Sequence, residues 1–320
     1  MRRLNSGRKI LVAGLGVALA ALLVACGAGG AQVTAPATAD AAPAARAGGS
    51  PAASPPRITG NLTVFAASSL TDAFNEMKRE IEAANPGTTV TFNFAASSTL
   101  ETQLEQGARA DVFASADEAQ MAKAQQAGVI AGDSRLFVRN TPVVIVPANN
   151  PAGIARPQDL AKPGVKLVLA AKGVPIGDYA RQVFANMDRN PAYGPDFSQR
   201  ALANLVSNET NVRQVVAKIQ LGEGDAGVVY ASDVTPSVRG QVKIIPIPED
   251  VNVVARYPAA VVKGAANAAG ARAFLDYLVS PAGQAILTKW GFVPLRPGGT
   301  PTPTSMTGVP AAARTGGEGR

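Results

Sequence analysis

Short apolar runs alternate with amphipathic stretches along the middle of the chain, and this alternation restricts the fold more than any other feature of the sequence. The runs at 62–66 and 90–94 are rich in Val, Phe and Thr and have the length of strands. The first is followed by apolar residues at helical spacing from Leu70 to about Ala84. Strands that alternate with helices predict mostly parallel sheets flanked by helices, so we expect an α/β fold.

The same alternation continues toward the C-terminus, where the chain is expected to close with two helices. The remaining expected elements are strands at 111–114, 143–146, 166–170, 227–230, 242–247 and 259–262, and helices at 99–106, 118–126, 178–187, 212–221, 265–278 and 282–289. In open α/β sheets, ligands bind beyond the carboxyl ends of the strands. The functional motifs are therefore expected directly after these strands.

Both flanks of this region are poor in large apolar residues. Residues 26–57 and 297–320 consist mainly of Ala, Gly, Pro, Ser and Thr, so they have little surface to bury. We expect a disordered tether over the first of these segments and a disordered tail over the second. The folded part is then 58–296, which is long enough for one large domain or two modest ones.

The N-terminus carries the pattern of an export signal. Four basic residues within 2–9 precede an apolar run at 10–25, which is shorter than the roughly 20 residues of a membrane span. The run ends in small residues before Cys26, the only cysteine, and this ending resembles a bacterial lipobox. We expect a lipoprotein signal peptide over 1–25 and a lipid on Cys26 that anchors the protein to the membrane, outside the cytoplasm, in the cell envelope. An ordinary membrane anchor with a chance cysteine is the alternative.

Composition makes several classes of function less favoured. The net charge is +7, but four positive charges belong to the signal, so the body is nearly neutral and does not indicate nucleic-acid binding. The sequence contains no histidine and its one cysteine is assigned to lipid, which excludes Ser-His-Asp triads, Cys-His dyads and histidine zinc sites within the chain. It also has no Walker or dinucleotide-binding glycine motif. The composition therefore argues against an enzyme.

Two consecutive strand–helix units place serines where a helix begins. Ser69 precedes Asp72, and Ser98 precedes Glu101, in the spacing of a capping box. Free backbone N–H groups and the positive end of the helix dipole favour an anion at such a position. The alternative is that both serine pairs only cap their helices. Two such turns on neighbouring strands favour the anion-binding interpretation.

Further turns fit the same scheme. Residues 174–179 and 208–213 each precede a helix, and the strand at 227–230 ends in Tyr230. A tyrosine at this position can supply a hydroxyl donor, although it can also be an ordinary half-buried aromatic residue.

Taken in order, these stretches make the chain resemble the periplasmic molybdate-binding proteins of ABC transporters. The resemblance covers about 62–294, and its matching stretches are 64–71, 94–100, 110–117, 174–177, 211–213, 227–230 and 257–259. It implies a two-lobed type II periplasmic-binding-protein fold, in which the ligand occupies the cleft between the lobes and favours a closed hinge.

The resemblance also implies where the lobes lie along the chain. Lobe 1 would contain 58–140 and 254–296, and lobe 2 would contain 141–253. Two crossovers, near 140–143 and 248–254, would join them.

The resemblance further implies the groups that hold the ligand. The hydroxyls of Ser69, Ser97 and Tyr230 and the backbone N–H groups of Ile176 and Val212 would bind a tetrahedral oxyanion. A smaller residue is common in the family at the position of Ile176; this difference alters the shape of the cavity but keeps the amide donor. Molybdate at neutral pH carries no proton, and such donors suit it without a charged partner.

The function implied is an extracytoplasmic solute-binding lipoprotein that captures molybdate or tungstate and delivers it to an ABC importer. Its partners would be the transporter permease and, through Cys26, the membrane; it would be a monomer without a cofactor. One alternative is a binding protein for sulfate, phosphate, a small organic anion or ferric ion, although ferric binders usually have several tyrosines or carboxylates in the site. Another is an adhesion or structural lipoprotein. We interpret Asp72 and Glu209 as acidic residues at the starts of helices, but either carboxylate could accept a hydrogen bond from a protonated anion.

Overall fold

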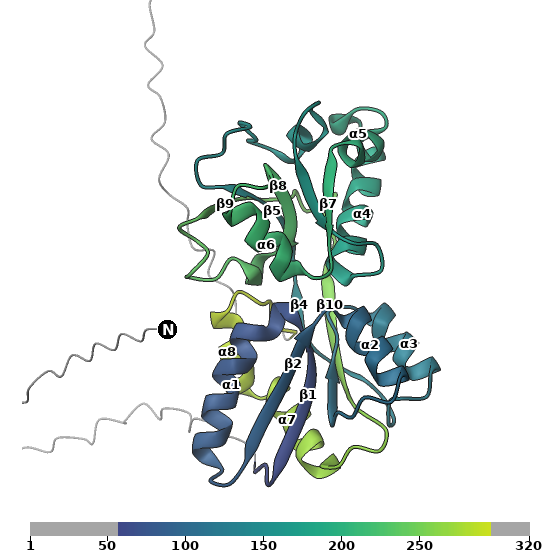
Figure 1. Cartoon of the computed structure of the whole chain (residues 1–320), viewed down its shortest axis with the longest axis vertical. Coiled ribbons are helices and arrows are strands. Elements are labelled where there is room, and N and C mark those ends of the chain that lie inside the picture. The colour runs from purple at the N-terminus through teal and green to yellow at the C-terminus, as the bar shows by residue number, and fades with distance from the viewer. Residues whose placement is uncertain (1–56, 296–320) are drawn as a thin grey trace, which may run out of the picture. The chain divides into compact units, whose positions relative to one another are not determined.

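The computed structural model describes residues 57–295, all of which belong to the compact unit Ser50–Arg320. The expected signal peptide, lipidated Cys26, tether and tail lie outside the described residues, apart from Arg57 at the end of the tether. The described part contains two five-stranded sheets, which Figure 1 shows as two lobes. Within it, no helix has the length and apolar character needed to cross a membrane.

The first sheet, which we call the sheet of lobe 1, has the strand order β2-β1-β3-β10-β4. Its strands are β1 (Asn61–Ala67), β2 (Thr89–Ala95), β3 (Val112–Ala114), β4 (Arg135–Asn140) and β10 (Ala255–Val261). The helices around it are η1 (Ser68–Leu70), α1 (Thr71–Ala84), α2 (Ser97–Glu105), α3 (Glu118–Gln126), α7 (Ala268–Val279) and α8 (Pro281–Lys289).

The second sheet, that of lobe 2, has the strand order β7-β6-β8-β5-β9. Its strands are β5 (Pro142–Pro147), β6 (Leu167–Ala170), β7 (Leu205–Glu209), β8 (Ala226–Tyr230) and β9 (Val242–Ile245). The helices around it are η2 (Pro157–Ala161), α4 (Pro175–Asp188), η3 (Pro191–Tyr193), α5 (Phe197–Ala203), α6 (Val212–Gln220) and η4 (Ala231–Asp233).

The expected α/β architecture with mostly parallel sheets is confirmed. In each sheet one strand is antiparallel to the other four: β10 in the first sheet and β5 in the second. Each of these is the first strand after the chain enters that sheet from the other one. Only Thr141 separates β4 from β5, and residues 246–254 lead back from β9 to β10.

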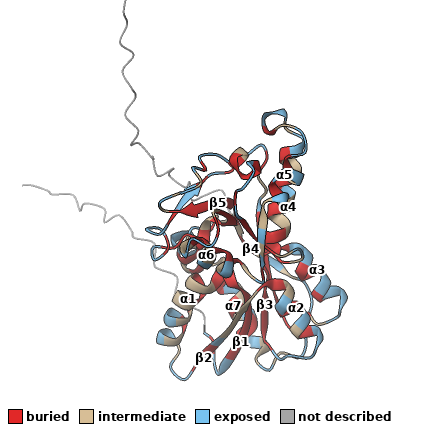
Figure 2. Cartoon of the chain, turned by 45° about the horizontal axis from the view of Figure 1, so that its top comes forward, coloured by how far each residue is buried: buried red, intermediate tan, exposed pale blue. Residues whose placement is uncertain are grey.

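Successive residues of β1 face two different cores. Leu62, Val64 and Ala66 belong to the large cluster that also contains Phe74 of α1 and its neighbours on α7 and α8. Phe65 belongs to a separate cluster with residues of α2 and α3. Because the β1 side chains alternate between the two faces of the sheet, helices pack on both faces, as Figure 1 shows. Buried residues concentrate between the sheet and these helices (Figure 2). The sheet is thus held rigidly, with its strand ends free to carry a site.

Candidate functional site

The five residues expected to bind a ligand line one small cavity. Ser69 and Ser97 reach it from lobe 1, and Ile176, Val212 and Tyr230 reach it from lobe 2. The rest of the lining consists of Ala67, Ser68, Ala96, Ala116, Val174 and Pro175. The cavity measures about 10 Å³, which is close to the space that one water requires. The structure therefore brings the five residues together, and their role in binding stays a prediction.

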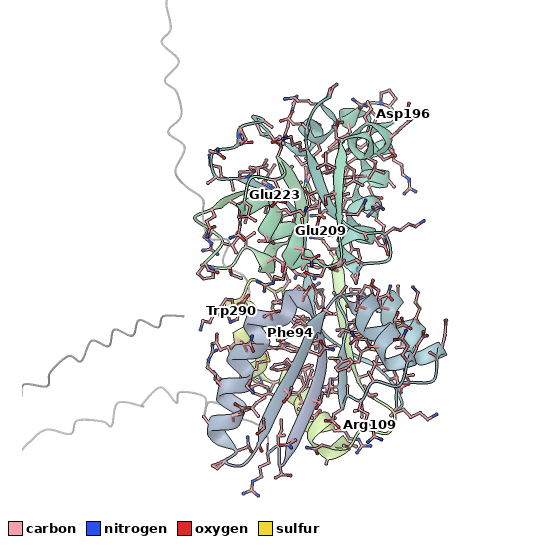
Figure 3. The ribbon with its side chains drawn as sticks, viewed as in Figure 1. Phe94, Arg109, Asp196, Glu209, Glu223 and Trp290 are labelled. Atoms are coloured by element: carbon pink, nitrogen blue, oxygen red, sulfur yellow. The ribbon has the colours of Figure 1, made fainter. Side chains whose placement is uncertain are left out.

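The cavity lies where strands of both sheets end. Figure 3 shows Phe94, near the end of β2, and Glu209, the last residue of β7, on either side of the junction between the lobes. Helices or helical turns follow these strands, so several helix N-termini converge on the junction. The first N–H groups of a helix have no partner within the helix and point toward such a site.

The serines do not cap helices, contrary to one interpretation of the sequence. The N-cap residue of α1 is Leu70 and that of α2 is Ala96, and neither helix has a side-chain cap. The expected capping boxes of Ser69 with Asp72 and of Ser98 with Glu101 are therefore wrong. Each helix starts one or two residues away from the position that a capping serine needs, and the buried hydroxyls of Ser69 and Ser97 bond elsewhere.

Two other helix starts present backbone donors to the cavity. Ile176 is the second residue of α4, whose N-cap residue Val174 provides no side-chain cap. Val212 is the first residue of α6, where the Asn211 side chain accepts only the N–H of Gln214, at 3.2 Å. At these first-turn positions the N–H groups of Ile176 and Val212 lack an intrahelical acceptor.

Ser97 is fully buried and its hydroxyl has a defined partner. Its Oγ accepts a hydrogen bond from the N–H of Ala116, at 2.9 Å. A backbone N–H can only donate, so Ser97 keeps its own proton for another acceptor. This proton is available to an acceptor in the cavity that Ser97 lines.

Ser69 is held by a residue outside the expected set. Its Oγ lies 2.9 Å from the Oη of Tyr257, which in turn accepts a hydrogen bond from the Nδ2 of Asn140 at 3.3 Å. Tyr257 lies in one of the stretches, 257–259, that carry the resemblance to the molybdate-binding proteins, but no local sequence pattern assigns it to the site. The bond joins residues 188 positions apart, so only the folded chain reveals it.

The Tyr230 hydroxyl is fully buried and has no hydrogen-bond partner among the described residues. An unsatisfied buried hydroxyl costs about 1–3 kcal/mol, and a hydrogen-bond acceptor in the cavity would remove this cost. Burial, followed by the neighbouring phenol of Tyr257, raises the pKa of Tyr230 well above its ordinary value. Tyr230 therefore stays protonated and can act as a donor.

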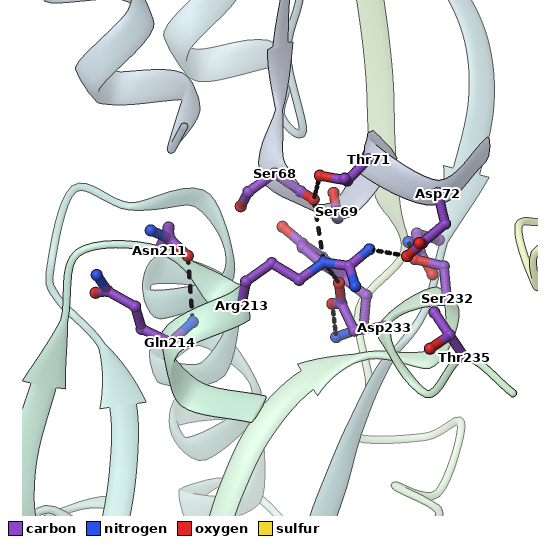
Figure 4. A network of polar contacts seen from close by, with 12 residues as sticks. Ser68, Ser69, Thr71, Asp72, Asn211, Arg213, Gln214, Ser232, Asp233 and Thr235 are labelled. Carbon is purple, nitrogen blue, oxygen red and sulfur yellow. Dashed lines mark hydrogen bonds and ion pairs between the residues drawn. The ribbon is translucent and has the colours of Figure 1, made fainter. Parts of the chain in front are cut away.

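No charged side chain is among the described residues that line the cavity. A charged network lies beside it instead (Figure 4). Arg213 pairs with Asp72, its Nε donates to the carbonyl of Ser68 at 3.2 Å, and the same Nε lies 3.6 Å from the Oδ1 of Asp233. Burial raises the pKa of Asp233 to about 6, although the Arg213 guanidinium opposes the shift.

The two acids that were expected at helix starts have different surroundings. Asp72 does lie in the first turn of α1, where it pairs with Arg213. Glu209 instead ends β7, and its carboxylate bonds Ser207 and lies 3.5 Å from Lys218. Neither carboxylate lines the cavity. Among residues 57–295 no group of three or more His, Cys, Asp or Glu is placed to hold a metal ion.

The chain is similar to proteins of one known family. The sequence model of the bacterial extracellular solute-binding proteins matches residues 62–293. The molybdate-binding protein ModA of Mycobacterium tuberculosis is 41% identical over 246 residues, which cover 76% of this chain and 89% of that protein.

Solved structures agree with this similarity. The substrate binding domain of a putative molybdenum ABC transporter from Clostridium difficile is 28% identical, with a TM-score of 0.56, and the match covers 74% of this chain and 100% of that domain. The periplasmic molybdate-binding protein of Azotobacter vinelandii is 20% identical, with a TM-score of 0.63 and coverage of 73% and 100%, and it supports the fold alone.

Proposed function

Because the chain belongs to the family of bacterial extracellular solute-binding proteins, we propose that it captures molybdate or tungstate and delivers the ion to an ABC importer. The observation that carries the ligand class is the buried, unpartnered hydroxyl of Tyr230 in a cavity lined by donors and by no charged group. A relative that is 41% identical is a molybdate-binding protein, and this supports the choice of oxyanion.

The chemistry of the lining suits an oxyanion without protons. Ser69, Ser97 and Tyr230 would donate hydroxyl protons, and Ile176 and Val212 would donate backbone N–H groups. Hydrogen bonds to an ionised acceptor are roughly twice as strong as neutral ones, and helix N-termini add partial positive charge. These donors together offset the desolvation of a dianion without a lysine or arginine in contact with it.

The position of the cavity supports a hinge. Its lining comes from both lobes, so separation of the lobes would open the cavity for an ion to enter. We assign 58–140 and 254–296 to lobe 1 and 141–253 to lobe 2, with Thr141 and 246–254 as the connections that bend. The ion would contact both lobes and so favour the closed state.

Other oxyanions fit the lining less well. Hydrogen phosphate would need an acceptor for its proton, and neither Asp72 nor Glu209 reaches the cavity. Sulfate is a smaller tetrahedral dianion, so a cavity fitted to molybdate would stretch its hydrogen bonds. Tungstate has nearly the size of molybdate, and the same donors serve both.

The family consists of solute-binding proteins, and we propose that this member performs no catalysis. The Ser69 hydroxyl contacts the phenol of Tyr257, whose pKa burial raises well above its ordinary value, so that this phenol stays protonated. The Ser97 hydroxyl contacts the Ala116 N–H, which can only donate, so neither serine contacts a group that takes up its proton. The family places the protein outside the cytoplasm. We further propose that a lipid on Cys26 anchors the protein to the membrane beside the importer permease, and that it acts as a monomer.

Calorimetric titration of the purified protein with molybdate, tungstate, sulfate and phosphate tests the proposal. We expect tight binding of the first two ions and weak binding of the others, with losses in Ser69→Ala, Ser97→Ala and Tyr230→Phe. If none of the four ions produces a heat of binding and none changes the melting temperature, the ligand assignment is excluded. Tighter binding of sulfate or phosphate than of molybdate would identify another oxyanion as the ligand.

A further inference from the structure

A chain of buried hydrogen bonds leads from the hinge to Ser69. Asn140 is the last residue of β4 and Tyr257 lies in β10, so both stand next to the two connections between the lobes. The Nδ2 of Asn140 donates to the Oη of Tyr257 at 3.3 Å, and this Oη lies 2.9 Å from the Oγ of Ser69. Ser69 lines the cavity, whereas Asn140 and Tyr257 do not.

The orientation of the Asn140 amide is fixed by its other bonds. The backbone N–H of Thr141 contacts the Oδ1 of Asn140 at 2.9 Å, and an N–H requires an oxygen there. The Nδ2 therefore faces the two hydroxyls, and its second proton goes to the Oγ of Ser232 at 2.8 Å. Asn140 can only donate to Tyr257.

This direction determines which hydroxyl donates next. If Ser69 donated to Tyr257, the phenol would accept twice and its own proton would have no acceptor among the described residues. A buried donor without a partner is costly, so Tyr257 donates to Ser69. The proton of Ser69 is then left for the cavity.

We propose that Asn140 and Tyr257 are positioning residues that force Ser69 to present a proton, and not a lone pair, to the ligand. The inference rests on the proposed oxyanion-binding function. It adds a reason for selectivity: an ion that carries a proton, such as hydrogen phosphate, meets a donor where it needs an acceptor. The N–H of Ala116 has the same effect on Ser97, because it donates to the Oγ and leaves the Ser97 proton for the ligand.

The test reverses the chain of donors. In Asn140→Asp the side chain can only accept, so Tyr257 would donate to the carboxylate, Ser69 would donate to Tyr257, and a lone pair would face the cavity. Tyr257→Phe removes the hydroxyl but keeps the ring, which packs against Phe137 and Phe292. Matched controls are Tyr277→Phe, which removes a buried hydroxyl bonded to Glu80, and Asn204→Asp, which removes an amide donor to two carbonyls.

Affinities for molybdate and phosphate are measured by calorimetry above the second pKa of phosphate, where both ions are dianions. Any repulsion by the new carboxylate then acts equally on both ions, so their affinity ratio reports the direction of the Ser69 bond. We expect Asn140→Asp to weaken molybdate binding about a hundredfold and to lower the molybdate-to-phosphate ratio at least about tenfold. Tyr257→Phe should weaken molybdate binding about tenfold and change the ratio less, because Ser69 is then free to turn. Both controls should keep the wild-type ratio.

The outcomes separate the two proposals. Wild-type protein that binds neither ion would overturn the proposed function and this inference with it. Wild-type protein that binds molybdate, with an unchanged ratio in Asn140→Asp, would overturn the inference alone. Wild-type molybdate affinity in Tyr257→Phe would overturn it as well, and this variant decides the question if Asn140→Asp fails to fold.

Discussion

The guanidinium of Arg213, on α6 of lobe 2, forms an ion pair with the carboxylate of Asp72, on α1 of lobe 1. Its Nε also donates to the carbonyl of Ser68, again across the junction. Figure 4 shows that these contacts lie around the turn that carries Ser69. A single side chain of one lobe thus contacts two groups of the other beside the cavity.

We predict that Arg213→Gln lowers oxyanion affinity about tenfold, because the closed arrangement loses its charged contacts between the lobes. The two side chains of the pair are about 30% exposed, so most of the effect should come from the bond to the Ser68 carbonyl. Calorimetric titration with molybdate checks the prediction. Arg135→Gln, which breaks an exposed pair with Asp276 within lobe 1, serves as the control. Equal molybdate affinity of Arg213→Gln and Arg135→Gln would contradict the prediction.

Tyr230→Phe should change stability and binding in opposite directions. Without ligand, the hydroxyl is unpartnered whenever the lobes are closed, so its loss should raise the free energy of unfolding by up to about 1 kcal/mol. With molybdate present, the lost donor should lower the affinity about tenfold or more. Denaturant unfolding with and without the ion measures both effects. Tyr277→Phe breaks a bond to Glu80 and should only lower stability, so a loss of stability in both variants would argue against an unpartnered hydroxyl.

Asp233→Asn should stabilise the protein at neutral pH. The pKa of Asp233 is raised from 3.8 to about 6, so the folded state favours the protonated form and loses stability as the pH rises through this range. The loss amounts to at most about 3 kcal/mol at pH values above about 6. Asparagine stays neutral and can still accept the N–H of Tyr230 through its oxygen. Thermal unfolding at a series of pH values should show a gain for the variant at neutral pH that disappears below about pH 4. A gain that is independent of pH would refute the shift.

Gly177→Ala should disturb the start of α4. A Cβ at this position would lie 2.2 Å from the carbonyl oxygen of Ala171 and 2.5 Å from that of Ala170, so the helix start must move. Overpacking of this kind costs about 1–3 kcal/mol, and displacement of the neighbouring Ile176 N–H should also weaken oxyanion binding. Gly240→Ala is a suitable control because a Cβ there meets nothing within 4 Å. Melting temperatures and molybdate titrations of the two variants measure the difference, and equal values would rule out the clash.

The regular elements were largely predictable because burial imposes a period on the sequence. The strand at β1 and the helix at α1 were located within a residue or two at each end. The strands β4 and β7 and the short helix α5 were missed. Both strands lie at an edge of their sheets, and Leu205 to Glu209 of β7 is half polar. The start of α4 was placed three residues late, although a proline suits the first position of a helix.

The positions of the site residues were predictable, but the contacts that orient them were not. Strand ends and helix starts are local features, so Ser97 and Tyr230 could be placed beside the expected site from the sequence. The bonds of Ser69 to Tyr257 and of Arg213 to Asp72 join residues 188 and 141 positions apart. Such contacts depend on the sheet order, which alternation alone does not specify. The two sheets also share one strand order, a structural repeat that the sequence does not display.

The lining without charged residues has a consequence for the loaded protein. No acidic or basic side chain among the described residues of the lining can take up or release a proton as the ion binds, so the complex is more negative than the empty protein by the full charge of the ion. Loaded and empty molecules should therefore migrate differently in a native electric field, even though their folds are nearly the same size. An importer that must ignore empty binding proteins has this difference in net charge to sense, in addition to any difference in shape.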